Sequence, residues 1–183
     1  MIRDIVIYGN AVLRTKGERV ETFDAELRAL AADMLETMYN ANGIGLAAQQ
    51  VGEVLQLTVI DVSHAESRPS QMWIDGAEVD PKEHMPLVLV NPEIQFGQEI
   101  EVGSEGCLSF PEVTGDIPRA VKISVKARDL DGKSIEFEAA GLLSRAVQHE
   151  ADHLNGILFI DRMSSAAKSS LAGKLKRLAS ESG

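Results

Sequence analysis

The segment Gln148–His153, with the sequence QHEADH, contains residues that could hydrolyse an amide. His149 and His153 are four residues apart, and Glu150 directly follows the first of them. Because an α-helix has about 3.6 residues per turn, both imidazoles would lie on one face and could bind the same metal ion. Glu150 would lie beside that ion, where it could accept a proton from a bound water. The spacing therefore predicts a hydrolytic metal site.

The residues around this motif predict a buried helix. Leu142, Ala146, His149 and His153 share one stripe at helical spacing, and Asn155-Gly156 provides a C-terminal stop. A helical histidine is more often an ordinary structural residue than a metal ligand. Two neutral imidazoles buried together need hydrogen-bonding partners, however, and one metal ion serves both.

Two histidines leave a tetrahedral site one protein ligand short. In one large class of zinc peptidases a third histidine follows, but this chain matches that pattern only to Gly156 and has Phe159 in the final position. Another class uses a downstream glutamate, and beyond Asp161 only Glu181 is available, close to the C-terminus. Cys107 is the only cysteine. A lone cysteine is usually a small buried apolar residue, but beside an incomplete two-histidine site it is the expected third ligand.

Three stretches of the chain resemble the three signature motifs of the peptide deformylases. Residues 43–50 (GIGLAAQQ) resemble the family's Gly-x-Gly-x-Ala-Ala-x-Gln motif, residues 105–109 (EGCLS) its cysteine motif, and residues 148–154 (QHEADHL) its helical motif. Residues 10–14 and 117–120 also resemble family sequence, so the resemblance covers nearly the whole chain. The first motif alone could be a phosphate loop, but no strand directly precedes it and no third glycine or lysine follows at the required spacing.

The resemblance implies an enzyme that removes the formyl group from N-formylmethionyl nascent polypeptides and releases formate. It implies that Cys107, His149 and His153 bind one divalent metal, iron(II) in the native protein. Zinc, nickel and cobalt suit the same donors. Glu150 would act as general base and then as general acid.

Other site roles follow from the resemblance alone. The Gln50 side chain and the Leu108 N–H would stabilise the tetrahedral oxyanion. Ile44 and Gly45 would hydrogen-bond an extended substrate through their backbones. Judged by its residue type and neighbours, Gln50 would be only a surface amide.

Several charged residues near the motifs have more than one interpretation. Glu105 and Asp152 could orient the ligand imidazoles or pair with Arg119 or Arg145, since a metal-bound histidine usually donates its second N–H to a carboxylate or carbonyl. They could equally be surface charges. Arg119 could instead contact the substrate. Asn42 stands at a position where many peptide deformylases, the family that this chain resembles, have a glutamate. We expect that exchange to affect only the rim of the pocket.

Apolar periodicity predicts an α+β fold in a single domain of residues 1–183. We expect small mixed or antiparallel sheets around a central metal-binding helix, with one helix before them and one after. The expected elements are a helix capped by Asp24 and reaching Tyr39, strands at 55–62 and 87–90, a loop or insertion at 63–84, a hairpin at 120–127 and 135–139, and a C-terminal helix at 164–180 with Leu171, Leu175 and Leu178 on one side.

Composition limits the location and the partners. One cysteine excludes an internal disulfide, and no long apolar segment follows the N-terminus, so we expect a cytoplasmic protein without a membrane span. The net charge of −10 argues against general or sequence-specific nucleic-acid binding. Residues 164–180 nevertheless carry four basic residues and no acid: Lys168, Lys174, Lys176 and Arg177. This basic segment could dock on the ribosome, as the resemblance to the peptide deformylases implies for some members, or it could form a solvated face.

Two other classes of function are considered beside the deformylase. A metallopeptidase would use the same water and Glu150, but the third histidine or glutamate of such enzymes is missing. A structural zinc protein would normally have four protein ligands and no use for Glu150, whereas only three ligands are evident here.

Overall fold

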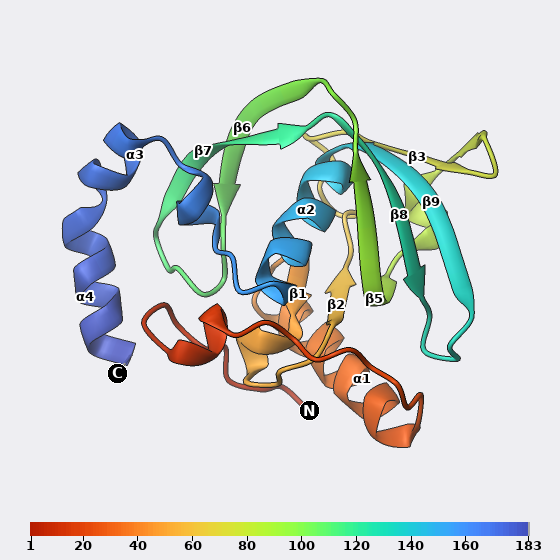
Figure 1. The fold of residues 1–183 in the computed structure, drawn as a ribbon, viewed down its shortest axis with the longest axis horizontal. Coiled ribbons are helices and arrows are strands. Elements are labelled where there is room, and N and C mark those ends of the chain that lie inside the picture. The colour runs from red at the N-terminus through yellow and green to blue at the C-terminus, as the bar shows by residue number, and fades with distance from the viewer. Residues whose placement is uncertain (183) are drawn as a thin grey trace.

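The strands form two antiparallel sheets in the part of the chain that the computed structural model describes, residues 1–182 (Figure 1). The larger sheet has the order β1-β2-β5-β8-β9-β3-β4, and β6 pairs with β7 in a separate sheet. The strands are β1 (Gly45–Ala47), β2 (Leu57–Ile60), β3 (Ser70–Ile74), β4 (Ala77–Val79), β5 (Leu87–Phe96), β6 (Ile100–Gly106), β7 (Thr114–Ala120), β8 (Lys122–Arg128) and β9 (Ser134–Gly141). The α-helices are α1 (Ala25–Asn40), α2 (Leu142–Leu154), α3 (Ser165–Ser170) and α4 (Ala172–Ser182), with short 3-10 helices at Ala11–Arg14, Ala48–Val51, Pro81–His84 and Phe159–Arg162.

Helix α2 lies at the centre of the protein, between the two sheets (Figure 1). It packs against β1, β2, β3 and β9 of the larger sheet and against β7 of the smaller one. Its buried residues include Ser144, Arg145 and Gln148 as well as the motif residues His149 and Glu150. Because buried polar groups need partners, the helix depends on polar groups of the surrounding elements as well as on apolar packing. The predicted α+β fold around a central helix is confirmed.

Three apolar clusters hold the other elements around α2. In the first, Val147 of α2 packs with Phe137 of β9. The second joins α1 to β1 and β2 around the fully buried Met34. The third contains Phe110 and Phe159, whose rings meet edge to face at 5.0 Å. The first cluster therefore fixes α2 on the larger sheet, the second joins α1 to that sheet, and the third packs together the segments that follow the cysteine motif and the helical motif.

Helix α1 begins as predicted. The Asp24 side chain accepts a hydrogen bond from the Leu27 N–H, which satisfies one of the free donors in the first turn. Strands β8 and β9 form the predicted hairpin. Strand β5 runs beyond its predicted end at Val90, because a register shift before Glu93 bends the strand and lets it continue pairing with β8.

The prediction of a loop at 63–84 is wrong over most of that segment. Strands β3 and β4 form a hairpin there, and β3 pairs with β9, which adds the hairpin to the larger sheet. Asp75 and Gly76 make its turn with φ values of 52° and 79°. Met72 is buried and Ile74 packs against the first cluster. An edge hairpin needs few apolar residues, because much of its surface faces solvent, and this made the segment resemble a loop.

Strands β6 and β7 were not predicted. Ile100 and Val102 of β6 are both exposed, and β7 contains Pro118 and buries the charged Arg119, so neither segment has the sequence pattern of a half-buried strand. The two strands pair along their full length, from Ile100 opposite Ala120 to Gly106 opposite Thr114.

The C-terminal helix predicted at 164–180 is divided at Leu171 into α3 and α4. Ser164 caps α3 through its side chain. Leu175 is buried, and Leu171 and Leu178 pack beside it against the third cluster, as predicted. Within residues 1–182, no helix has the length and apolar character needed to cross a membrane.

Candidate active site

The three predicted metal ligands meet in space. One donor atom from each of Cys107, His149 and His153 lies within 4.8 Å of the other two. Cys107 Sγ is 3.3 Å from His153 Nε2, and the imidazole rings are 5.0 Å apart. The histidines are buried on α2, whereas Cys107 is half-buried. A helix thus supplies two donors, and a segment some forty residues earlier supplies the third.

Cys107 reaches the histidines because a tight turn follows β6. The Phe110 N–H donates to the Cys107 carbonyl at 2.9 Å, and the Phe110 ring is buried in the third cluster. Glu105 lies two residues before Cys107 at the end of the same strand. This short segment therefore provides one ligand and, through Glu105, a hydrogen-bond partner for another.

Glu105 orients the imidazole of His149. Its Oε1 lies 2.8 Å from His149 Nδ1, which leaves the other ring nitrogen for a metal. Arg119 and Arg145 also donate to Glu105 at 2.8 to 2.9 Å. Burial alone would raise the pKa of Glu105, but the hydrogen bonds from Arg119 and His149 outweigh it and lower that pKa to about 2. Glu105 is therefore ionised and held by three side chains.

Arg119 joins Glu105 to Asp152 and is itself buried. Its Nη1 donates to Asp152 Oδ2 at 2.6 Å, and Arg162 donates to both oxygens of Asp152 at 3.0 and 3.2 Å. Of the interpretations open from the sequence, surface charge is wrong for Glu105 and Asp152, and pairing is right. Arg119 does not line the cavity around Cys107, so nothing in this geometry supports its expected contact with a substrate.

The pKa values of the two ligand histidines are shifted in opposite directions. Burial holds the pKa of His153 well below its usual value. Burial also acts to lower the pKa of His149, but the hydrogen bonds with Cys107 and Glu105 outweigh it and raise that pKa well above the usual value. Since metals bind neutral imidazole, the raised pKa of His149 makes metal binding there depend on pH.

Glu150 occupies the position of a general base. Its carboxylate is buried in the site, and burial raises its pKa to about 7, which a nearby cation would lower again. Among residues 1–182, nothing donates to Glu150 Oε2. Gly45 makes room for this side chain, because a β-carbon at residue 45 would lie 2.6 Å from Glu150 Oε1.

Gln50 is buried rather than a surface amide. Its Oε1 accepts a hydrogen bond from the Ala47 N–H at 2.9 Å, which determines the orientation of the amide. Its Nε2 then donates to Ser109 Oγ at 3.1 Å and lies 3.6 Å from Cys107 Sγ. Sequence reasoning missed Ser109, although it belongs to the EGCLS stretch and a hydroxyl in that motif was the available signal.

Two backbone features complete the site. The Leu108 N–H donates to no acceptor within the described residues, so it is free for a ligand. Strand β1 is the outermost strand of the larger sheet, which leaves one edge unpaired within residues 1–182. The Ile44 carbonyl accepts from the Asp61 N–H at 2.9 Å, and this bond fixes the chain where β1 begins.

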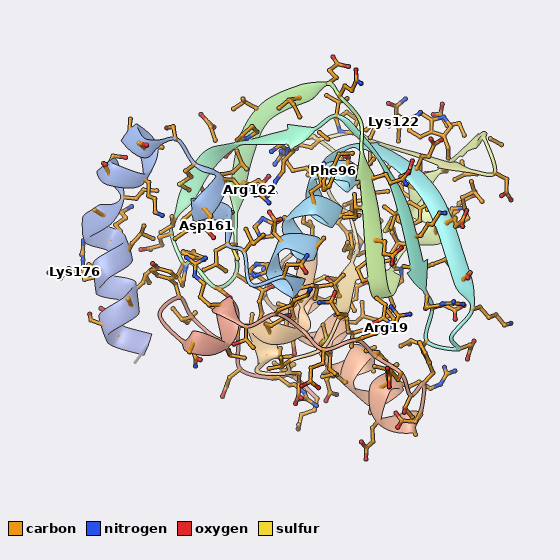
Figure 2. All side chains as sticks on the ribbon, in the orientation of Figure 1. Arg19, Phe96, Lys122, Asp161, Arg162 and Lys176 are labelled. Carbon is orange, nitrogen blue, oxygen red and sulfur yellow. The ribbon has the colours of Figure 1, made fainter. Side chains whose placement is uncertain are left out.

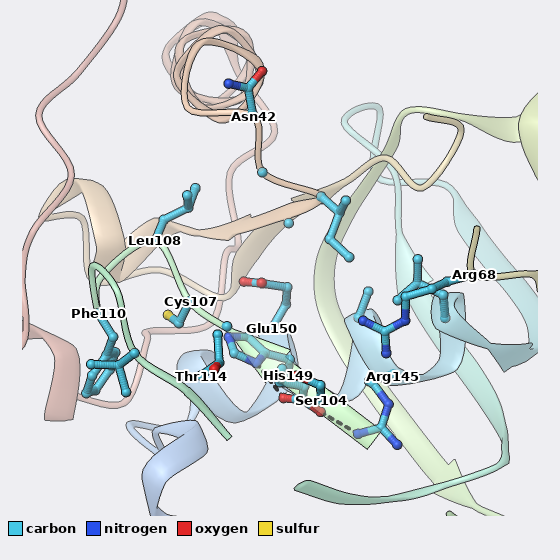
Figure 3. A pocket seen from close by; sticks show the side chains of 18 of the residues that line it. Asn42, Arg68, Ser104, Cys107, Leu108, Phe110, Thr114, Arg145, His149 and Glu150 are labelled. Atoms are coloured by element: carbon cyan, nitrogen blue, oxygen red, sulfur yellow. Dashed lines mark hydrogen bonds and ion pairs between the residues drawn. The ribbon is translucent and has the colours of Figure 1, made fainter. Parts of the chain in front are cut away.

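A cavity of about 540 Å³ adjoins these groups (Figure 3). Cys107, His149 and Glu150 form part of its wall, with Ile44 and Gly45 from the start of β1. Figure 3 shows Phe110 on one side of the cavity and two arginines, Arg68 and Arg145, on the other.

The donor set fits one divalent transition metal. A thiolate and two imidazoles are three ligands, which leaves a position for a further ligand, and Glu105 holds the second nitrogen of His149 as is usual around a bound metal. Three ligands with a buried carboxylate beside them, in a cavity bordered by a free strand edge, define the site of a metal-dependent hydrolase.

The comparisons with known proteins agree with this class. The family model described as polypeptide deformylase matches residues 2–169, and the chain belongs to this family. A peptide deformylase of Methylacidiphilum infernorum is 48% identical over 178 residues, covering 97% of this chain and 93% of that protein. The crystal structure of the peptide deformylase from Thermus thermophilus matches with a TM-score of 0.84 at 34% identity, covering 100% of both chains. The one from Thermotoga maritima matches with a TM-score of 0.77 at 39% identity, covering 90% of this chain and 99% of that one.

Proposed function

We propose that this protein removes the formyl group from the N-terminal formylmethionine of newly made polypeptides and releases formate. The observation that carries this proposal is the convergence of Cys107, His149 and His153 beside Glu150 in one cavity, in a chain of the polypeptide deformylase family. Three ligands rather than four favour a catalytic over a structural site.

Cys107, His149 and His153 would hold one divalent ion, which acts as a Lewis acid and lowers the pKa of a water at its open position. We expect iron(II) natively. Zinc, nickel or cobalt could replace it, because a thiolate with two imidazoles suits all four ions.

Glu150 would hold the proton that moves during the reaction. Its Oε2 has no hydrogen-bond donor among residues 1–182, so it can accept a proton from the attacking water and later return it to the leaving amine. Burial, which raises the pKa of Glu150, makes the carboxyl a better base before attack and allows it to serve as an acid afterwards.

Gln50 and Leu108 would stabilise the tetrahedral oxyanion. Ala47 and Ser109 orient the Gln50 amide with its second N–H toward Cys107 Sγ, and the Leu108 N–H is free within residues 1–182, so both groups are positioned before the substrate arrives. Preorganised donors of this kind are typically worth about 3 kcal/mol each. Ile44 and Gly45, at the free edge of β1, would hydrogen-bond the backbone of an extended peptide.

A formate-release assay tests the activity. The purified protein, loaded separately with iron(II) under nitrogen and with nickel, is given a formylmethionyl peptide and the same peptide without its formyl group. We expect the formylated peptide to release formate, and we expect no cleavage of the internal peptide bonds of either peptide. Cleavage of an internal bond, or no formate with metal bound, would contradict the proposal.

We also propose a cytoplasmic location and docking on the ribosome through α3 and α4. The leucines of this segment pack inward on the third cluster, while Lys168, Lys174, Lys176 and Arg177 are exposed. Lys176 projects from α4 away from the rest of the protein (Figure 2). Four exposed cations on one segment suit the phosphates of ribosomal RNA, which the acidic remainder of the chain would repel.

Reversing charge tests docking better than deleting the segment, because deletion would also remove the buried Leu175. The double change Lys174→Glu and Lys176→Glu is expected to abolish co-sedimentation with ribosomes at low salt while leaving peptide deformylation near the unchanged rate. The matched control is Lys122→Glu with Lys126→Glu on β8. Equal co-sedimentation of both double variants and the unchanged protein would refute docking through this segment.

A further inference from the structure

Arg68 is a free positive charge at the junction of two cavities. It lines the catalytic cavity and also a second one of about 250 Å³, and Leu142 and Arg145 are the other residues shared by both. Its guanidinium makes no hydrogen bond or ion pair with any residue in 1–182. Figure 3 shows Arg68 and Arg145 together on the side of the cavity away from Phe110.

The backbone just after Arg68 is held in place. The Pro69 carbonyl accepts the Leu142 N–H at 3.0 Å, and Ser70 Oγ accepts the Leu143 N–H at 3.0 Å, so this segment closes the first turn of α2. Gly141 permits that approach, since a β-carbon there would lie 2.3 Å from the Pro69 carbonyl oxygen. Arg68 therefore directly precedes a backbone segment that is fixed to the helix carrying the catalytic residues, and little backbone freedom is lost when it contacts a ligand.

The neighbouring cations are already neutralised. Arg145 donates to Glu105 and to the carbonyls of Glu101 and Ile117. Arg119, which borders the second cavity, lies between Glu105 and Asp152. Glu101 also borders the second cavity, but no ion pair joins it to Arg68. The uncompensated charge at this end of the catalytic cavity is that of Arg68.

We propose that Arg68 selects formylated peptides that carry an acidic side chain shortly after the formylmethionine. This inference rests on the proposed deformylase function and names a sequence preference of the same site. The formyl group must lie at Cys107, His149 and Glu150, so a chain extended through the cavity brings a later side chain toward Arg68. A carboxylate is the group that pairs with a guanidinium through two hydrogen bonds.

The preference should appear in KM rather than in kcat. Arg68 lies away from the reacting atoms, so a contact with it stabilises the bound substrate and the transition state equally. Arg68 is exposed, and a solvent-exposed ion pair of this type corresponds to about a threefold difference in affinity. Added salt should reduce it, since the screening length is about 10 Å at 0.1 M.

The test uses the metal-loaded full-length protein and formylmethionyl peptides with amidated C-termini. Glutamate and glutamine are compared at the second, third and fourth positions. We expect kcat/KM to favour glutamate about threefold at one of these positions, through a lower KM, and the ratio to approach one in about 0.5 M salt. Arg68→Gln should bring the ratio of kcat/KM for the glutamate and glutamine peptides to one, whereas Arg68→Lys should keep most of the preference. Arg68→Glu should instead favour a peptide with lysine at the same position.

Arg19→Gln is the matched control, because Arg19 borders a separate cavity beside α1 and should leave the ratio unchanged. A variant that only disturbs folding would slow all peptides alike and keep the ratio. Equal kcat/KM for glutamate and glutamine peptides at every position, or a ratio that survives Arg68→Gln, would overturn the role of Arg68. No turnover of any formylated peptide would overturn the proposed function itself, and this inference with it.

Discussion

Gly45 lies directly against the side chain of Glu150. A β-carbon at residue 45 would be 2.6 Å from Glu150 Oε1 and 2.9 Å from its Cγ, closer than real β-carbons approach other atoms. The first strand of the larger sheet and the central helix therefore meet at a point where only glycine fits. The carboxylate of Glu150 can occupy this position because residue 45 has no side chain.

Gly45→Ala should displace the Glu150 carboxylate without removing a ligand. We expect kcat/KM for a formylated peptide to fall by about 10² or more, because a misplacement of about 1 Å is enough for such a loss. Metal content should stay at one ion per chain. Gly173→Ala is the control, since a β-carbon there meets nothing within 4 Å. Normal turnover by Gly45→Ala would show that Glu150 can move without cost.

Glu150→Gln removes the proton acceptor while keeping the shape of the side chain. If Glu150 moves the proton, the variant should bind metal normally and lose at least about 10² in kcat, the usual scale of general acid–base catalysis. Metal analysis and single-turnover kinetics on the same sample check both parts. Near-normal turnover with metal bound would assign the proton transfer to another group.

Cys107→Ala should abolish tight metal binding, because two imidazoles remain where three donors converged. With iron(II), the unchanged protein should also lose activity in air, since both the ion and the thiolate can be oxidised. Nickel or cobalt should protect it. Parallel aerobic and anaerobic preparations with metal analysis provide the measurement. Equal and durable activity of the iron form in both would argue against iron bound by a thiolate.

Glu105→Gln should weaken metal binding without touching a ligand. The change removes the charge that faces His149 Nδ1 and leaves Arg119 and Arg145 with a neutral partner. Loss of such an outer partner typically costs about 10- to 100-fold in metal affinity or activity. Competition with a chromogenic chelator measures the affinity, and Glu138→Gln on the surface of β9 is the control. An unchanged affinity would mean that the negative charge of Glu105 is not needed to hold His149 for the metal.

Asp161→Asn should give a pH-dependent loss of stability. Burial would raise the pKa of Asp161, but the hydrogen bonds from Arg14 and the Leu158 N–H outweigh it and hold that pKa below its ordinary value of 3.8. The ionised form therefore stabilises the fold above pH 3.8, and this contribution is lost as the pH falls from 3.8 through the lowered pKa of Asp161 in the folded protein. Arg14 and Asp161 are both partly exposed, so we expect a deficit of about 0.5 to 1 kcal/mol at pH 7. Denaturant unfolding should show the free energies of unfolding of the two proteins converging as the pH falls below 3.8. A deficit that stays constant with pH would rule out the ion pair as its cause.

The residues of the catalytic helix could be predicted because their arrangement is local. Helical periodicity places His149 and His153 on one face of a helix whatever surrounds it, and Glu150 follows from the same spacing. The caps at Asp24 and Ser164 are local for the same reason, since each bonds within its own first turn. Cys107 could be inferred only by eliminating other third ligands, and the pairing of β6 with β7 is what brings it to the helix.

The sequence by itself determined which chemistry was present, whereas tertiary structure decided which charges meet. Glu105, Arg119 and Asp152 allowed several interpretations, because their partners come from β6, β7 and α2. Gln50 was assigned from family resemblance, since its burial depends on packing that no local pattern encodes. Arg68 lies in the loop before β3, and nothing in its local sequence marks it as a cavity residue. It reaches the cavity because β3 pairs with β9, a contact between residues about 70 apart, and pairing at such separation is set by the whole chain rather than by neighbouring residues.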